Sequence, residues 1–272
     1  MEKLNLKRFA AITLLLLPSL ASADFLQGKS AMLEQDFAAA MQQFEPLASH
    51  GDVKSQYVMG VMFDDGLGVE RDYQQAAMWY GKAAEQGNID SQYNLGVMYS
   101  KGQGVEVNAE KSVYWYQQAA EQGFAPAQFA LADMYSKGWG VTQSYAEAAK
   151  WYENAANQDH YKSQLMLGIL YLEGNGVEKN DSLAANWIKK SAEQGHYKAQ
   201  YTMAMMFKDG IGVKQDLVLA YALLDLATRD GHAEANNIRR KVEMLLGQQQ
   251  LKEAKSLAAQ WQQSKPITIP IR

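Results

Sequence analysis

The sequence of 272 residues contains no cysteine. Disulfide bonds are therefore excluded, as are a thiolate nucleophile, a zinc site with cysteine ligands and a lipid anchor on cysteine. Because 47% of the residues are hydrophobic, the chain can bury a substantial core, and we expect packing alone to stabilise it.

The sequence also lacks an apolar run long enough to cross a membrane, which takes about 20 residues. The apolar run at 9–17 follows three basic residues, and the small-x-small triplet at 21–23 matches a signal-peptidase site. We expect residues 1–23 to be a cleaved signal peptide. The mature chain would then begin near Asp24, in the periplasm of a double-membraned bacterium or otherwise outside the cell.

An excess of basic charge is missing as well. Removal of the signal peptide takes three basic residues and one acidic residue from totals of 26 and 30, which leaves 23 basic and 29 acidic residues and a formal charge of −6. An acidic chain is a poor match for phosphate backbones, so we do not expect nucleic acid as a partner.

A Gly-x-Gly-Val motif occurs five times, and each copy begins 36 residues after the last. The copies begin at Gly66, Gly102, Gly138, Gly174 and Gly210. A phosphate-binding loop is needed once per site, whereas five copies in register indicate one structural unit repeated along the chain. We interpret the glycines as connectors between two helices.

The second helix of each unit has signals at both ends. The side chains that can cap its N-terminus are Asp72, Asn108, Ser144, Asn180 and Asp216. Its core positions include Trp79, Trp115, Trp151, Trp187 and Leu223. A glycine that can close the helix in the left-handed conformation follows in four of the five units. Asp159 replaces it in the third unit, where we expect a looser or differently capped end.

The first helix of each unit has a small, an aliphatic and an aromatic residue at i, i+4 and i+8, as at Ser91, Leu95 and Tyr99. This spacing places one apolar stripe along the helix, which we assign to the core rather than to a cofactor site. Glycine within a helix costs up to about 1 kcal/mol relative to alanine. The glycines at 60, 96 and 168 therefore indicate close approach by a neighbouring helix.

These features resemble the Sel1-like repeat family, a relative of the tetratricopeptide repeats. The resemblance rests on residues 92–99, the glycine pair before Val105 and residues 115–123, and it covers about 36–247. It implies an all-α fold, a right-handed α-solenoid of about five antiparallel helix pairs, which usually serves as a protein-binding scaffold.

The expected repeats are 52–87, 88–123, 124–159, 160–195 and 196–231. We interpret both ends as caps: residues 24–51 contain a second helix alone, kinked or weakened by Pro46, and residues 232–263 contain a half repeat and one amphipathic helix. The tail 264–272 is extended, and we expect a flexible end, with a strand that docks on a partner as the alternative.

A second stripe on the first helices varies between repeats while the core positions hardly change. In a solenoid of helix pairs the first helices line the concave surface, so we predict that this stripe binds a partner; the alternative is that it varies only because it is exposed. The candidate residues on this stripe are Val58, Val61, Asn94, Val97, Lys101, Ala130, Asp133, Lys137, Met166, Ile169, Thr202 and Met205.

Trp139 is a further candidate for partner binding. Its counterparts in the other loops are Leu67, Gln103, Asn175 and Ile211. The fold therefore does not require an indole there, and tryptophan is enriched at binding hot spots. The alternative is that Trp139 packs onto the neighbouring repeat.

Catalytic and metal-binding patterns are not found. His160, His196 and His232 recur every 36 residues, but helices packed about 8–10 Å apart cannot bring all three within about 2 Å of one ion. We expect these histidines in the turns that enter the first helices. The Ser-x-x-Lys, Ser-Asp-Asn and Lys-Thr-Gly motifs of penicillin-recognising enzymes are missing. We assign no catalytic residue, metal or cofactor.

The sequence therefore predicts an exported, non-enzymatic scaffold that binds a protein or peptide partner in its concave groove, in the regulation or assembly of the cell envelope. Two alternatives stay open. One is a binder of cell-wall glycan or peptidoglycan, and the other is a weak penicillin-binding or β-lactamase-like protein, which has been described in a cysteine-rich branch of the family.

Overall fold

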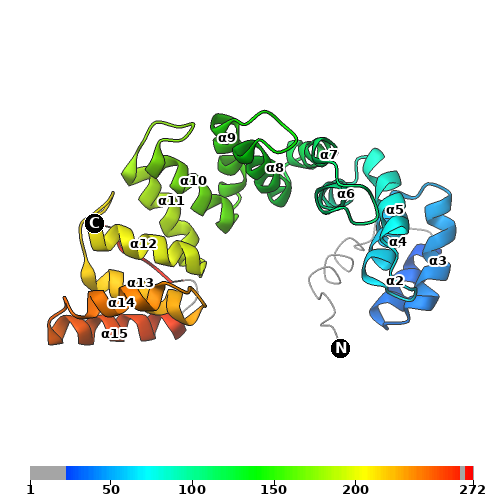
Figure 1. The fold of residues 1–272 in the computed structure, drawn as a ribbon. Helices are drawn as coiled ribbons and strands as arrows, with labels where there is room; N and C mark the ends of the chain where they lie inside the picture. Colours follow the sequence, from blue (N-terminus) through cyan, green and yellow to red (C-terminus); the bar gives the residue numbers. More distant parts are fainter. Residues whose placement is uncertain (1–22, 264–266, 272) are drawn as a thin grey trace. The chain divides into compact units, whose positions relative to one another are not determined.

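The computed structural model describes residues 23–263 and 267–271. These residues form fourteen α-helices, and no strand occurs among them (Figure 1). The all-α repeat fold predicted from the sequence period is confirmed. The predicted signal peptide lies outside the described residues, except for Ala23, which begins α2 (Ala23–Leu33).

Ten of these helices form the five predicted pairs, each joined by a loop that carries the Gly-x-Gly motif. The pairs are α4 (Val53–Asp65) and α5 (Tyr73–Glu85), α6 (Ile89–Lys101) and α7 (Ala109–Glu121), α8 (Ala125–Lys137) and α9 (Tyr145–Ala156), α10 (Tyr161–Glu173) and α11 (Asp181–Glu193), and α12 (Tyr197–Asp209) and α13 (Leu217–Arg229). The other helices are α2, α3 (Phe37–Ser49), α14 (Ala235–Glu243) and α15 (Gln248–Gln263).

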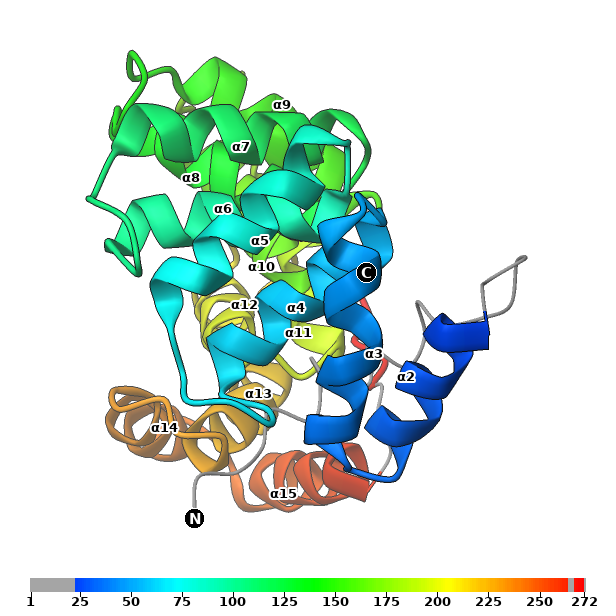
Figure 2. The same cartoon turned by 90° about the vertical axis from the view of Figure 1, so that its right-hand side faces the viewer.

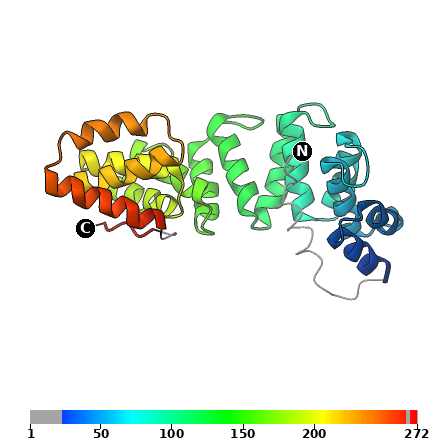
Figure 3. The same cartoon turned by 90° about the horizontal axis from the view of Figure 1, so that it is seen from below.

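The described residues divide into two units. The first ends at Ala127 and also includes 139–141, and the second comprises 128–138 and the residues after 141. Within the first unit α5 packs on both α4 and α6, and within the second α11 packs on both α10 and α12 (Figures 2 and 3). In these two repeats the second helix thus contacts both its own partner and the first helix of the next repeat.

The predicted helix caps are confirmed in all five repeats. The capping side chains accept hydrogen bonds of 2.8–3.2 Å from backbone N–H groups two or three residues later; they are Asp72, Asn108, Ser144, Asn180 and Asp216. The closing glycines have φ between +85° and +98°. Asp159 adopts the same left-handed region with φ of +60°, and α9 has 12 residues where the other second helices have 13. The expectation of a different cap is nevertheless wrong: the N–H groups of Asp159 and His160 donate to Ala156 O and Ala155 O, as those of Gly87 and Asn88 donate to Ala84 O and Ala83 O.

The glycines inside the first helices make room for a side chain from the second helix. A Cβ atom on Gly60 would lie 2.5 Å from the ring of Tyr80, and one on Gly168 would lie 2.4 Å from Ile188. Tyr80 and Ile188 are fully buried. The deepest core position is thus the residue after each tryptophan, whereas the tryptophans at 115, 151 and 187 are only half-buried. The predicted close approach to these glycines is confirmed, and the group that comes closest is a side chain of the second helix.

The second glycine of each loop rests on the backbone of the preceding repeat. A Cβ atom on Gly104 would lie 2.0 Å from the carbonyl oxygen of Tyr73, and one on Gly212 would lie 2.0 Å from that of Asp181. Tyr73 and Asp181 are the first residues of second helices. The glycines are therefore connectors, as predicted, and they also form the junction between repeats.

A ladder of glutamine side chains crosses the buried faces between helices. Gln56 Nε2 donates to Ala48 O at 3.0 Å, and Gln86 Nε2 donates to Gln56 Oε1 at 2.7 Å. The glutamine pair recurs, at 2.8 Å each time, as Gln122 with Gln92, Gln158 with Gln128, and Gln194 with Gln164. These bonds satisfy amides that would otherwise be buried without partners.

The N-terminal cap is a shortened repeat, not a second helix alone. A Cβ atom on Gly28 of α2 would lie 2.8 Å from the ring of Phe44 in α3, the same arrangement as Gly60 on Tyr80. Gly28 precedes Gly60 by 32 residues rather than 36. The 36-residue period does not reveal α2, because the shorter connection moves this helix out of register. Helix α3 continues through Pro46.

The C-terminal cap contains the predicted amphipathic helix. In α15, Ala254, Ala258 and Trp261 are buried, and α15 packs on α13. The expectation of a flexible tail is wrong for residues 267–271. Ile267 and Ile269 are buried against the chain's own second unit, because their alternation gives an extended segment one apolar side.

No helix in the described ranges is both long enough and apolar enough to span a membrane.

We predict that Gly104→Ala destabilises the chain far more than Gly123→Ala. Both glycines are left-handed, with φ of +69° and +89°, but only position 104 meets backbone atoms, while the space around position 123 is open. The left-handed conformation costs alanine about 1–2 kcal/mol in both variants, and crowding adds about 1–3 kcal/mol or more at 104. Urea unfolding followed by circular dichroism measures the difference, and equal losses would contradict the junction contact.

Candidate partner-binding site

The variable stripe of the second unit occupies equivalent positions on α8, α10 and α12. Six of its seven side chains are half-buried and Lys137 is exposed; the six are Ala130, Asp133, Met166, Ile169, Thr202 and Met205. Half-burial at equivalent positions means that one edge of each side chain stays open to solvent. The structure thus retains all seven predicted residues as candidates for partner contact.

The stripe of the first unit is smaller than predicted. Val97 is half-buried and Lys101 is exposed, while Asn94 is 8% exposed. Val58 and Val61 are only 2% and 0% exposed, because both valines belong to the apolar cluster of this unit. The prediction that these two valines contact a partner is therefore corrected: they are core residues.

The exposed part of the second unit's stripe combines apolar and charged groups. Met166, Ile169 and Met205 supply apolar edges, and methionine adapts to partners of different shape. Lys137 Nζ pairs with Asp133 at 2.5 Å across one helical turn. The stripe therefore suits an amphipathic segment that places apolar side chains between the helices and polar groups beside the ion pair.

Asp133 also affects a buried neighbour. Burial, followed by the negative charge of Asp133, raises the pKa of Tyr152 above its ordinary value. Tyr152 therefore stays a neutral phenol at physiological pH, as its place in the core requires. It is a packing residue and offers no general base beside the stripe.

Trp139 is 41% exposed in its loop. Its counterpart Leu67 is 6% exposed and belongs to the core of the first unit. The large open fraction of the indole means that Trp139 is not enclosed by a neighbouring repeat. Its role as a binding hot spot stays a prediction.

The repeated histidines lie in the turns that precede first helices, as predicted for them. His160 and His196 are the N-cap residues of α10 and α12, and Ser163 N donates to His160 Nδ1 at 3.4 Å. Tyr161 and His196 have ring centroids 4.9 Å apart, and those of Tyr201 and His232 are 4.0 Å apart. The histidines thus belong to a row of aromatic rings in contact, some edge-on and some stacked. Among the described residues, no cluster of three metal-binding side chains occurs.

The environment of His196 keeps its ring neutral. Burial, followed by the positive charges of Lys198 and Lys162, lowers the pKa of His196 to about 4. Burial, and then Lys162, also lower the pKa of His160. The His196 ring therefore packs as a neutral aromatic group in the pH range where free histidine titrates.

The glycine-closed helix pairs, with the same junction contacts repeated along the chain, define a solenoid built from helical hairpins. A family model of the Sel1 repeat matches residues 53–88, 89–124, 125–160, 162–196 and 198–232. The chain belongs to the Sel1 repeat family. The resemblance inferred from the sequence is confirmed, and the fold is one that generally serves as a scaffold for protein interactions.

Two solved structures are similar to most of the chain. One is a protective antigen of uropathogenic Escherichia coli strains that displays an SLR fold; it is 35% identical over 93% of this chain, with a TM-score of 0.81. This chain spans only 55% of that antigen. The other is a Sel1 repeat protein from Oxalobacter formigenes, which is 29% identical, with 86% of this chain and 97% of that one covered and a TM-score of 0.75. No curated protein matches.

We predict that acid weakens the fold through His196. Its unfolded pKa is about 6.5 and its folded pKa is about 4, so between these values the unfolded chain binds a proton that the folded chain does not. The free energy of unfolding therefore falls as the pH drops from 7 to 4, by about 1 kcal/mol from this half-exposed ring.

The variant His196→Asn should flatten the pH dependence measured by urea unfolding at pH 4 to 7. His160→Asn should flatten it in the same direction, since burial lowers the pKa of that histidine too. A slope in His196→Asn equal to that of the wild type would contradict the assignment.

Proposed function

We propose that this chain is an exported scaffold that binds a protein or peptide partner along the first-helix stripe of its second unit. The observation that carries the proposal is the contrast between positions. Core residues recur at the 36-residue interval, while the half-exposed stripe changes from Ala130 and Asp133 to Met166 and Ile169. Packing explains the first set, and selection for a particular partner explains the second.

Export and a role in the cell envelope are supported by the sequence. The basic, apolar and small-x-small segments at 1–23 have the order of a signal peptide. A relative that covers 93% of this chain is described as a protective antigen. We place the mature chain in the periplasm or outside the cell, where its partner would be an envelope protein.

The best test exchanges the charges of the stripe without removing its ion pair. In Asp133→Lys with Lys137→Asp, the helix keeps an i, i+4 pair while the local polarity reverses. We expect capture of the partner from envelope extracts to weaken at least tenfold, about 1.4 kcal/mol, because like charges then face each other at the interface. Crosslinking through a photoreactive residue at Ala130 or Ile169 identifies the partner.

The matched control reverses a similar pair on the second helix of the same repeat. Lys150 and Glu147 of α9 form an i, i+3 pair, and their exchange should leave capture unchanged. Equal losses from both exchanges, with helicity intact, would contradict binding at the stripe.

A glycan-binding function is favoured by one specific observation, the exposed aromatic side chains Tyr114, Trp139, Tyr145 and Tyr161. A glycan binder would sediment with purified cell wall and lose this property in Trp139→Ala. Hydrolysis of a chromogenic β-lactam by the purified protein would instead support the enzymatic alternative.

A further inference from the structure

The C-terminal residues of the chain occupy a channel on the second unit. Ile267 and Ile269 are 4% and 0% exposed, whereas Thr268 and Pro270 face solvent. The N–H of Ile269 donates to Glu193 Oε1 at 2.7 Å, and that of Ile267 donates to Glu193 O at 3.3 Å. The channel thus holds an extended segment through backbone bonds and two aliphatic side chains two positions apart.

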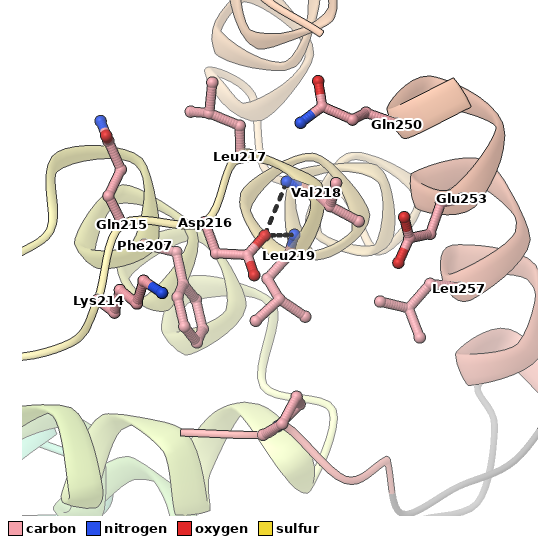
Figure 4. A pocket seen from close by; sticks show the side chains of 11 residues that line it. Phe207, Lys214, Gln215, Asp216, Leu217, Val218, Leu219, Gln250, Glu253 and Leu257 are labelled. Atoms are coloured by element: carbon pink, nitrogen blue, oxygen red, sulfur yellow. Dashed lines mark hydrogen bonds between the residues drawn. The ribbon is translucent and has the colours of Figure 1, made fainter. Parts of the chain in front are cut away.

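The tail leaves much of the adjoining space unfilled. Beside Pro270 lies a cavity of about 600 Å³, whose walls include Leu217, Leu219, Glu253 and Leu257 (Figure 4). This volume is within the range of pockets that hold ligands in proteins. A segment with a larger side chain in place of Pro270 would have room to bury it there.

The repeat architecture explains why this cavity exists. In the preceding repeat, Asp181 at the start of α11 supports Gly212 of the next loop. Leu217 is the equivalent first residue of α13, and no sixth Gly-x-Gly motif follows it in the sequence. The cavity is therefore the space that the loop of a further repeat would fill. It lies at the N-terminus of α13, where Asp216 caps the helix.

A buried acceptor lies on the other side of the tail. Gln200 is 1% exposed, and none of the described residues donates to its Oε1 atom. Earlier repeats supply a glutamine donor from the end of the second helix, but Asp230 stands at that position here. A cavity of about 30 Å³ connects Gln200 with Ile267. With the chain's own tail in place, Gln200 Oε1 therefore has no donor among the described residues, and the small cavity beside Ile267 stays unfilled.

The charges around the two cavities favour a basic occupant. The acidic side chains that line them are Glu193, Asp216, Asp230 and Glu253, and the basic ones are Lys214 and Arg229. In the sequence, the tail itself is flanked by Lys265 and Arg272. The excess of acidic groups attracts a segment with the same flanking charges.

We propose that this channel is a peptide-binding site, which the chain's own residues 267–271 occupy until a partner displaces them. The partner is an extended polypeptide end with two aliphatic side chains two positions apart, a large side chain after the second, and basic flanks. A second copy of this chain is a weaker competitor, because each tail is covalently linked to its own channel and is therefore present there at a high effective concentration. The site is separate from the first-helix stripe and goes beyond the function proposed above.

The test uses the full chain with its tail released. In Ile267→Asp with Ile269→Asp, carboxylates replace two buried side chains and expel the tail, whereas Thr268→Asp adds charge at an exposed position and serves as the matched control. The probe is a fluorescein-labelled peptide with the sequence of residues 264–272, and its binding is followed by fluorescence anisotropy. We expect the released chain to bind this peptide at least tenfold more tightly than the wild type or the control.

Two altered peptides test the specificity. A peptide with aspartate at both isoleucine positions should not bind the released chain. A peptide with Pro270→Phe should bind about 5–10-fold more tightly than the native sequence, because its ring enters the larger cavity. Equal affinity for the native and aspartate peptides would overturn the proposal.

The remaining outcomes also decide the question. A released chain that keeps its helical circular dichroism but binds the peptide no better than the control overturns the proposal. So does loss of helicity in both the released chain and the milder variant Ile269→Ala, since the tail would then belong to the core.

A wild-type dimer that depends on concentration and is lost in the released chain assigns the channel to a second copy. The Asp133–Lys137 exchange should leave peptide binding unchanged, which separates this site from the stripe.

Discussion

The fold depends on the absence of a side chain at the second glycine of each loop. At Gly104 and Gly212 the loop lies directly on the backbone that begins the preceding second helix, with no room for even one carbon atom. This contact sets how far each hairpin stands from the one before it. The apolar stripes and the glutamine ladder can then meet in the same register in every repeat, because the spacing that they need is already fixed by the backbone.

A fixed spacing separates two kinds of position in the sequence. Residues that face another hairpin must fit the same shape each time, so Tyr80, Tyr116 and Tyr152 recur at the base of the core. Residues that face outward are free of that requirement, and the side chains at 130, 166 and 202 differ in size and polarity. In this architecture the geometry of the proposed binding surface is common to the repeats, while the chemistry of its side chains differs from one repeat to the next.

The periodic part of the fold could be read from the sequence, since caps, loops and stripes each have a local signature that returns every 36 residues. The departures from the period could not. Helix α2 was missed because its connection is shorter, and Val58 and Val61 were placed in a binding stripe because their burial depends on tertiary packing near the chain's beginning. The docked tail was missed for a related reason: alternating isoleucines indicate a one-sided strand, but not which surface covers that side.

The hydrogen bonds of the glutamine ladder all run in the same direction along the chain. This direction affects how the last hairpin would meet another molecule. The glutamine pair of each rung lies within one hairpin, and the first-helix glutamine also donates to a carbonyl oxygen of the hairpin before it, as Gln56 does to Ala48 O and Gln92 to Ala84 O. A bare last hairpin would leave such a carbonyl oxygen open to the first hairpin of another molecule. Heterologous contacts of that kind grow into open filaments. In the last hairpin Asp230 stands where earlier repeats have the glutamine that would donate to Gln200. Ile267 and Ile269 of the tail are buried nearby. The burial of Ile267 and Ile269 thus covers apolar surface beside the last hairpin that would otherwise favour such end-to-end contacts.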